Sequence, residues 1–214
     1  MHGEPVGLAR ICACILAAVG WFGLVAQLIV SLGLFADQGR TALDAVWAYL
    51  GYFTVLTNIL VATALTRFAI GGVHRPSNSV MTAVTCYILI VGVTFVTLLQ
   101  NLYDLNGLHL IADRTMHHVM PALTVLFWFA FVPKGTLRWR YVLGWMVFPL
   151  TYVVYAVLRG VVEGFYPYPF IDVSKIGWGQ TAINSVGLFA AFLLVGLGAI
   201  ALDGVLGKRA QAAA

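Results

Sequence analysis

The chain has 214 residues, of which 61% are apolar and only 9% are charged, and its formal net charge is +4. Soluble domains carry about 45–50% apolar and about 25% charged residues, so the composition excludes a soluble globular protein and predicts an integral membrane protein. The small positive charge does not indicate a nucleic-acid partner, because the basic residues of membrane proteins gather in the cytoplasmic loops that set orientation.

Long apolar runs predict an all-α fold, a polytopic bundle of transmembrane helices that forms a single domain over residues 1–214. A helix needs about 20 residues to cross a hydrocarbon core of about 30 Å. The runs predict six spans, at residues 8–35, 46–70, 78–101, 115–133, 138–159 and 179–206.

The basic residues predict the orientation of these spans. With both termini inside, eight basic residues lie on the inner side and four on the outer side. Because positively charged residues collect on the cytoplasmic side, we expect an N-in/C-in, multi-pass protein of the plasma (inner) membrane.

The second span carries two polar residues on one helix face, Thr54 and Asn58, which are four positions apart. We expect Thr54 about two turns below the outer end and Asn58 one turn deeper. Most membrane threonines simply bond back to the carbonyl one turn earlier, but a primary amide at this depth needs partners inside the bundle. The third span ends with Gln100 and Asn101 on the same outer side.

The fourth span opens with an adjacent pair of histidines, His117 and His118, followed by Pro121. Neighbouring helical residues point about 100° apart, so only one imidazole of the pair faces the bundle interior. A histidine at the interface that reaches back to water is the alternative interpretation for either residue.

The last two spans also place polar side chains in their outer halves, whereas the inner halves of all spans are nearly uniformly apolar. The residues concerned are Tyr152, Tyr155 and Arg159 in the fifth span and Gln180 and Asn184 in the sixth. An aromatic belt explains part of the tyrosine stripe. Polar side chains are costly in lipid and usually face the bundle interior, so the pattern predicts a polar pocket within the outer leaflet.

Two short motifs, "YFTVLTN" at residues 52–58 and "MHHVMP" at residues 116–121, resemble the androgen-induced and androgen-dependent membrane proteins that hydrolyse fatty acid esters of hydroxy fatty acids. The chain is more similar still to their small bacterial six-span relatives, which share a "YPYPF" loop, here Tyr166 to Phe170. The resemblance implies a threonine nucleophile at Thr54 and a histidine base at His117. The animal enzymes differ by one additional residue between their histidine and the following proline.

This chemistry sets further expectations for the site. A threonine hydroxyl needs a base within hydrogen-bond reach, and the oxyanion needs a donor. We expect Asn58 to be that donor, with Asn184 or a tyrosine hydroxyl as the second choice. We also expect Gln180, Tyr152, Tyr155 and Asn101 to line the pocket, and Arg159 or Arg114 to attract a substrate carboxylate. Asp113 and Asp104 look like boundary residues, so the expected machinery is a dyad.

The expected substrate is a lipid or fatty-acyl ester, the surrounding partners are membrane lipids, and no cofactor or metal is expected. The sequence predicts no oligomeric state. Three other functions compete with ester hydrolysis. The same pocket would suit a non-catalytic protein that binds or transports a lipid or small solute. Haem ligation by His117, His118, His109 or His74, and a zinc site from His109, His117 and an aspartate, are the other two.

Overall fold

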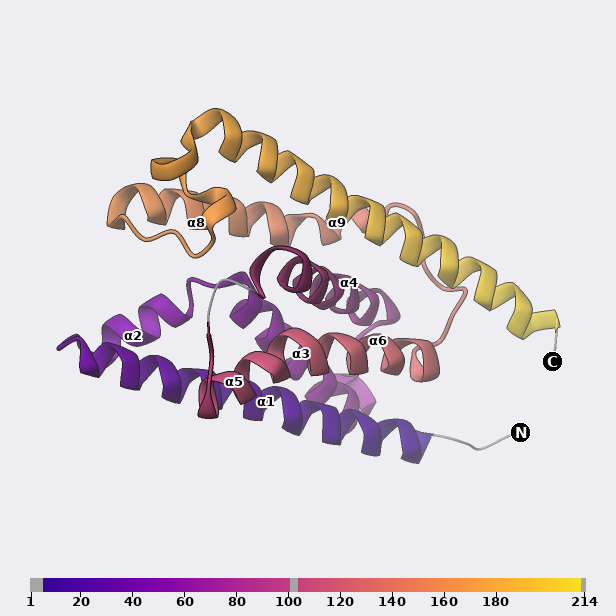
Figure 1. Ribbon diagram of the computed structural model, residues 1–214. Helices are drawn as coiled ribbons and strands as arrows, with labels where there is room; N and C mark the ends of the chain where they lie inside the picture. Colours follow the sequence, from indigo (N-terminus) through magenta and orange to yellow (C-terminus); the bar gives the residue numbers. More distant parts are fainter. Residues whose placement is uncertain (1–5, 101–103, 213–214) are drawn as a thin grey trace. The chain divides into compact units, whose positions relative to one another are not determined.

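The computed structural model describes residues 6–100 and 104–212, and within them every regular element is a helix (Figure 1). The all-α prediction is therefore confirmed for this part of the chain. The chain divides into two compact units, Met1–Pro133 and Lys134–Ala214.

The first unit is built from helices that run back and forth. In chain order they are α1 (Val6–Asp37), α2 (Ala42–Tyr49), α3 (Phe53–Ile70), the short 3₁₀ turn η1 (Gly72–His74), α4 (Asn78–Thr94), the π-helical turn η2 (Phe95–Leu99), α5 (Gly107–Arg114), the π-helical turn η3 (Thr115–Val119) and α6 (Met120–Phe131).

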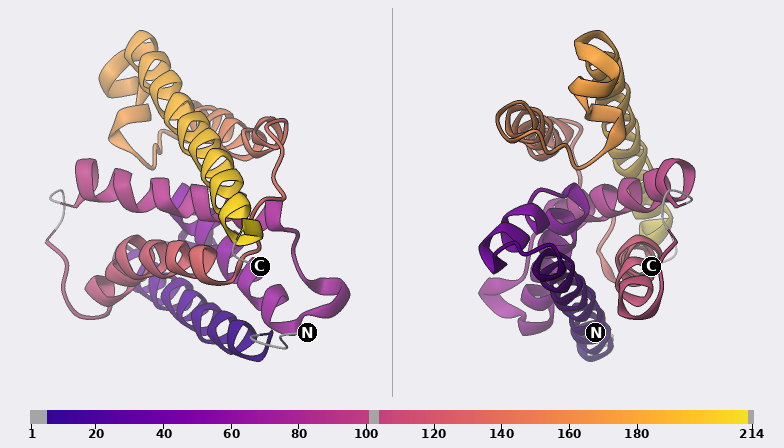
Figure 2. Two further views of the ribbon diagram at one scale, coloured as in Figure 1. Left: turned by 90° about the vertical axis from the view of Figure 1, so that its right-hand side faces the viewer. Right: turned by 60° about the vertical axis from the view of Figure 1, so that its left-hand side comes forward.

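Small residues on α1 allow the helices of this unit to approach closely. Helix α1 packs against α3, α5 and α6, and α4 packs against α3 and α6 (Figures 1 and 2). Ala13 is fully buried in this core, and a Cβ added to Gly20 would lie only 3.0 Å from the methyl carbon of Met120. Close approach at small residues is the usual way in which membrane helices associate.

The second predicted span is two helices rather than one continuous helix over residues 46–70. Thr41 caps α2 through a capping box with Asp44, and the helix ends at Tyr49. A new helix, α3, then begins at Phe53 after an extended residue, Tyr52. Thr54 therefore lies in the first turn of α3 and not two turns inside a continuous helix, which corrects its expected position within the helix.

The fourth predicted span begins earlier than residue 115, because the helical run starts at Gly107 and continues to Phe131. His117 is consequently inside a helix rather than at its opening. Pro121 has no amide hydrogen, so it cannot bond the carbonyl of His117 one turn earlier. The turn before it is π-helical, with the amide of Met120 donating to the carbonyl of Thr115.

The second unit consists of α7 (Tyr141–Trp145), α8 (Val147–Glu163), the 3₁₀ turn η4 (Pro169–Ile171) and α9 (Val173–Ala212). Helix α9 contains a kink at Gly177, whose φ of 75° is outside the helical region. Asp203 ties α9 to the segment before α7, because its carboxylate accepts the amide of Leu137 at 3.0 Å and its carbonyl accepts the amide of Gly135 at 3.1 Å.

Five helices among the described residues are long and apolar enough to cross a membrane. They cover Gly7–Asp37, Phe53–Ile70, Asn78–Leu99, Tyr141–Glu163 and Val173–Ala212. The composite run α5–η3–α6 carries charged residues in its first half and is not one of the five. The membrane character of the chain is thus supported. The count of six spans, which needs the predicted span at residues 115–133, and the N-in/C-in orientation stay predictions.

Candidate active site

Three side chains of the first unit form a continuous chain of polar contacts. The Nε2 atom of His117 lies 3.3 Å from the hydroxyl oxygen of Thr54. The other ring nitrogen, Nδ1, lies 2.9 Å from the carboxylate Oδ1 of Asp113 and 3.1 Å from the carbonyl oxygen of the same residue. A hydroxyl, an imidazole and a carboxylate in this order are the arrangement of a catalytic triad.

Local helix geometry brings each of these groups to the site. Asp113 and His117 are four residues apart on one helical run and therefore lie on the same face. Thr54 comes from the first turn of α3, which packs against η3. The triad thus joins two helices that are far apart in the sequence.

The acceptors around the imidazole fix its tautomer. Both groups that face Nδ1, the carboxylate and the carbonyl of Asp113, only accept hydrogen bonds, so Nδ1 carries the hydrogen. In the neutral imidazole with this tautomer, the lone pair of Nε2 faces the hydroxyl oxygen of Thr54 at 3.3 Å. A general base for the threonine needs this neutral form of the ring.

The site is buried, which strengthens its electrostatics. Thr54 is 6% exposed, and the side chains of His117 and Asp113 are 15% and 11% exposed. Interactions between charges are stronger here than in water, because the surroundings have a low effective dielectric constant. The positive end of the α3 dipole also lies at Thr54, in the first turn of that helix.

Two π-helical turns face each other at the imidazole. Phe95, the first residue of η2, stacks on the ring of His117 with centroids 4.0 Å apart and the planes 14° from parallel. His118 contacts the same ring edge-on, 5.5 Å away, and forms no bond to Thr54. Isolated π-helical turns are frequent at functional sites, because the additional residue redirects the side chains of one turn.

A glycine permits this close arrangement. A Cβ added to Gly92 of α4 would lie 2.9 Å from Cβ of Pro121 and 3.2 Å from the carbonyl oxygen of His117. Any larger residue would push α4 away from the turn that holds the imidazole. Gly92 and Pro121 therefore belong to the framework that positions His117.

Asn58 lies beside the triad, but its amide nitrogen is already engaged. It donates to the carbonyl of Thr54 at 2.9 Å and to the carbonyl of Met116 at 3.4 Å, and so ties α3 to η3. Its Oδ1 atom is fully buried and has no hydrogen-bond partner among the described residues. The expected donation from Asn58 to an oxyanion is not a contact that this arrangement provides.

Most of the other predicted site residues belong to the second unit, where they bond to one another or contact the "YPYPF" loop. Arg159 is 7% exposed, and it donates to Glu163 at 2.7 Å and to the hydroxyl of Tyr155 at 3.1 Å. Asn184 donates to the carbonyl of Phe170 at 2.9 Å, and Gln180 donates to Asn184 at 2.8 Å.

Aromatic contacts complete this second cluster. The ring of Tyr152 lies 6.3 Å from that of Tyr155 and 6.5 Å from that of Tyr168, measured between centroids. Gly160 leaves the space that the ring of Tyr166 fills. These side chains thus have local partners of their own. Asn101 lies outside the residues that the structure describes.

Asp113 is the residue that sequence reasoning missed. It looked like a loop or boundary residue in the sequence, and its carboxylate was therefore excluded as the third member of a triad. The signal was present, because Asp113 and His117 have the spacing at which helical side chains meet. The helix had to begin at Gly107 for that spacing to apply.

Within the described residues, no group of three or more His, Cys, Asp and Glu side chains lies close enough to hold a metal ion. Comparisons with protein-family models, with curated proteins and with solved structures found no match to this chain.

Proposed function

We propose that this chain is an integral membrane hydrolase of lipid esters, with Thr54 as nucleophile, His117 as general base and Asp113 as the group that positions His117. The observation that carries the proposal is the chain of contacts from the carboxylate of Asp113 through His117 to the hydroxyl of Thr54. A weak hydroxyl nucleophile is activated when a base oriented by a third group stands within hydrogen-bond reach, and this site has all three parts.

In the first step the hydroxyl oxygen of Thr54 attacks the ester carbonyl while its proton passes to Nε2 of His117. The tetrahedral intermediate collapses, the ester C–O bond breaks, and His117 gives the proton to the departing alkoxide. An alcohol leaves and an acyl-threonine ester stays on the enzyme. Asp113 stabilises the imidazolium that exists between these two transfers.

The first turn of α3 offers a donor for the developing oxyanion. The first hydrogen bond of this helix runs from the amide of Leu56 to the carbonyl of Tyr52, so the amide of Val55 precedes the intrahelical ladder. In hydrolases whose nucleophile begins a helix, the amide of the following residue binds the oxyanion. We assign that role to Val55 in place of the side chain of Asn58.

In the second step a water molecule attacks the acyl-threonine, and His117 again takes and returns one proton. The acid is released and Thr54 regains its hydroxyl hydrogen. Substrate chains reach the site from the lipid phase, in a protein of six spans with both termini inside and the triad near the outer leaflet. The resemblance of the two motifs favours fatty acid esters of hydroxy fatty acids as substrates, with Arg114, which is exposed beside Asp113, attracting the free carboxylate.

The test is turnover of a fluorogenic long-chain acyl ester by purified full-length protein. We expect Thr54→Val and His117→Ala to lower kcat/KM by at least about 10³-fold, as the loss of a nucleophile or base does in related triads. The matched controls are Thr57→Val, on the same helix, and His118→Ala, in the same π-helical turn. Both should keep activity within about threefold.

A fluorophosphonate probe provides a second readout that does not depend on the choice of ester. It should label the wild-type protein at Thr54, and the label should be absent from Thr54→Val. If ester and probe both react equally well with Thr54→Val, the nucleophile is elsewhere. If neither reacts with folded wild-type protein, the rival proposal of a non-catalytic lipid-binding protein replaces the hydrolase.

A further inference from the structure

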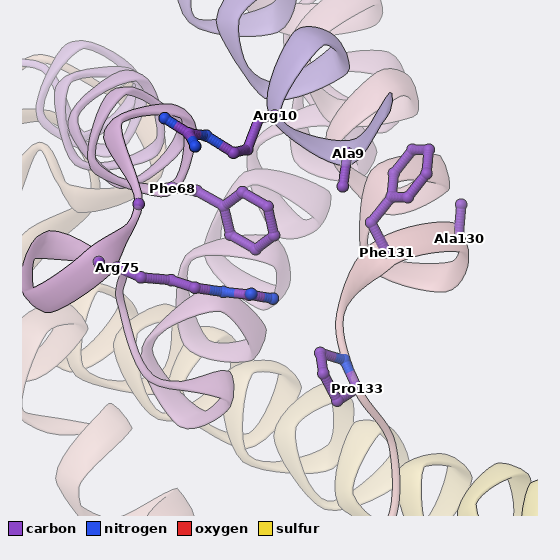
Figure 3. A pocket seen from close by; sticks show the side chains of 9 residues that line it. Ala9, Arg10, Phe68, Arg75, Ala130, Phe131 and Pro133 are labelled. Carbon is purple, nitrogen blue, oxygen red and sulfur yellow. The ribbon is translucent and has the colours of Figure 1, made fainter. Parts of the chain in front are cut away.

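A second feature of the first unit lies at the opposite end of α3 from Thr54, about 20 Å away along the helix. It is a pocket of ≈ 280 Å³ lined by residues of α1, α3, α6 and the segments that follow α3 and α6: Ala9, Arg10, Phe68, Gly71, Gly72, Arg75, Ala130, Phe131 and Pro133 (Figure 3). This volume is near the lower end of the range for small-ligand sites.

Two arginines supply the polar part of this lining. Arg10 donates from Nε to the carbonyl of Ala69 at 2.7 Å and from Nη2 to the carbonyl of Ile70 at 2.8 Å, and it thereby closes the C-terminal end of α3. These bonds use only two of its nitrogens. Its third nitrogen, Nη1, has no hydrogen-bond partner in residues 6–100 and 104–212.

Arg75 is held by stacking and not by hydrogen bonds. Its guanidinium carbon lies 4.3 Å from the centroid of Phe68. Figure 3 shows the side chain extended beneath this ring, with the guanidinium group directed toward the side on which Phe131 and Pro133 lie. Among the described residues, no hydrogen-bond acceptor or carboxylate pairs with it, so its planar set of donors is aligned and unused.

The described acidic residues of the first unit lie away from the pocket. The pocket end carries Arg10, Arg67 and Arg75, and no acidic side chain lines the pocket. The described acidic residues of this unit belong to the other ends of the same helices or to the segments that join them there: Asp37, Asp44, Asp104 and Asp113. The lining of the pocket therefore has a net positive charge, and none of the described residues that form it carries a compensating negative charge.

We propose that this pocket binds the phosphate group of an anionic phospholipid. A guanidinium group matches the geometry of phosphate oxygens with two parallel N–H donors. Arg75 presents such a pair, and Arg10 adds a second positive charge. Basic pockets between helices at the cytoplasmic side of a membrane are suited to anionic head groups, and the predicted orientation places this end inside.

The apolar part of the lining distinguishes a lipid from a free phosphate ion. Phe68, Phe131 and Pro133 surround the cationic groups, and such a surface suits a glycerol backbone and the first carbons of acyl chains. Inorganic phosphate shares the anionic group but gains nothing from these residues. The proposal does not depend on the chemistry at Thr54.

The experiment measures the thermal unfolding midpoint of the full-length protein in a neutral detergent as lipid is added, because a ligand that binds only the folded state raises this midpoint. The probes are phosphatidylglycerol, phosphatidylcholine and inorganic phosphate, each alone. We expect phosphatidylglycerol to stabilise the wild-type protein at low concentration, and the two others to have no effect there.

Arg75→Gln is the decisive variant, because the side chain of Arg75 forms no hydrogen bond within the described chain and its loss should leave the fold intact. It should weaken phosphatidylglycerol binding about tenfold or more, the cost of losing a charge-assisted hydrogen bond. Arg75→Lys, which keeps the charge but not the planar donors, should lose less. Arg10→Gln should weaken binding and also lower the lipid-free midpoint, because Arg10 holds the end of α3.

The matched control is Arg138→Gln, an exposed arginine outside the pocket that is predicted to lie on the same side of the membrane. It should bind phosphatidylglycerol like the wild type. Equal affinities for Arg75→Gln and Arg138→Gln would overturn the pocket, because the attraction would then be a general surface effect. Stabilisation by inorganic phosphate that Arg75→Gln abolishes would keep a phosphate site and overturn the lipid as its occupant.

Discussion

Replacing Asp113 by asparagine is the sharpest test of the triad, because it removes one charge and changes almost nothing in shape. In the structure the carboxylate lies 2.9 Å from Nδ1 of His117. The carbonyl of the same residue accepts from Nδ1 at 3.1 Å and persists in the variant. The tautomer should therefore be kept, and the variant should lose chiefly the electrostatic stabilisation of the imidazolium.

The size of that loss follows from Coulomb's law. Opposite unit charges about 4 Å apart attract by about 4 kcal/mol at an effective dielectric constant of about 20. The side chains are 15% and 11% exposed, so water screens part of this interaction, and we expect about 2–3 kcal/mol. Asp113→Asn should thus lower kcat by roughly 30–150-fold, clearly less than the loss expected for His117→Ala.

The assay is steady-state turnover of the acyl ester, analysed for kcat and KM separately, together with the rate of labelling by the fluorophosphonate. A positioning role lowers kcat and the labelling rate and leaves KM nearly unchanged. Asp104→Asn is the control, since Asp104 is an exposed loop residue. A kcat for folded Asp113→Asn within threefold of wild type would refute the role of the carboxylate and return the site to a dyad.

Two further predictions concern the framework of the site. Gly92→Ala should destabilise the protein by about 1–3 kcal/mol, as overpacking does, and reduce turnover, because the new Cβ would lie 2.9 Å from Pro121. The control is Gly33→Ala in α1, which has nothing within 4 Å and should be neutral or slightly stabilising. Equal unfolding midpoints for the two variants would contradict the steric argument. Thr57→Val should raise the unfolding midpoint, because the buried Thr57 hydroxyl has no partner among the described residues. Removing it should increase the free energy of unfolding by up to about 1 kcal/mol. A lower midpoint would show that the hydroxyl is hydrogen-bonded.

Hydropathy predicted the long helices well, because burial in lipid needs continuous apolar runs. It failed where the backbone changes direction without a change in polarity. The break between α2 and α3 falls at Leu50 to Tyr52, within an apolar run, so a window of average hydropathy passes over it. The start of the helix at Gly107 was missed for the converse reason, because the charged residues before Thr115 looked like a loop although the backbone there is helical.

For the polar residues too, the sequence pattern predicted which side chains lie together but not how they are hydrogen-bonded. Their types and spacing pointed to Thr54, Asn58 and His117, and the structure places these three side by side. The sequence did not reveal which groups were already bonded. Arg159 has an acidic partner one turn away, Glu163, and the amide of Asn58 faces two carbonyls, so neither presents the free donor that its residue type suggested.

The π-helical turn at Thr115–Val119 makes the site sensitive to chain length in a way that its residue types do not show. Deleting one residue from this turn would convert it to ordinary α-helix, and the helix would still be long enough and still apolar. The residues on one side of the deletion would turn by about 100° relative to those on the other. Asp113 and His117 lie on opposite sides of a deletion of Thr115 or Met116. The loss of either codon would therefore leave a helical protein with an imidazole that no longer meets its carboxylate.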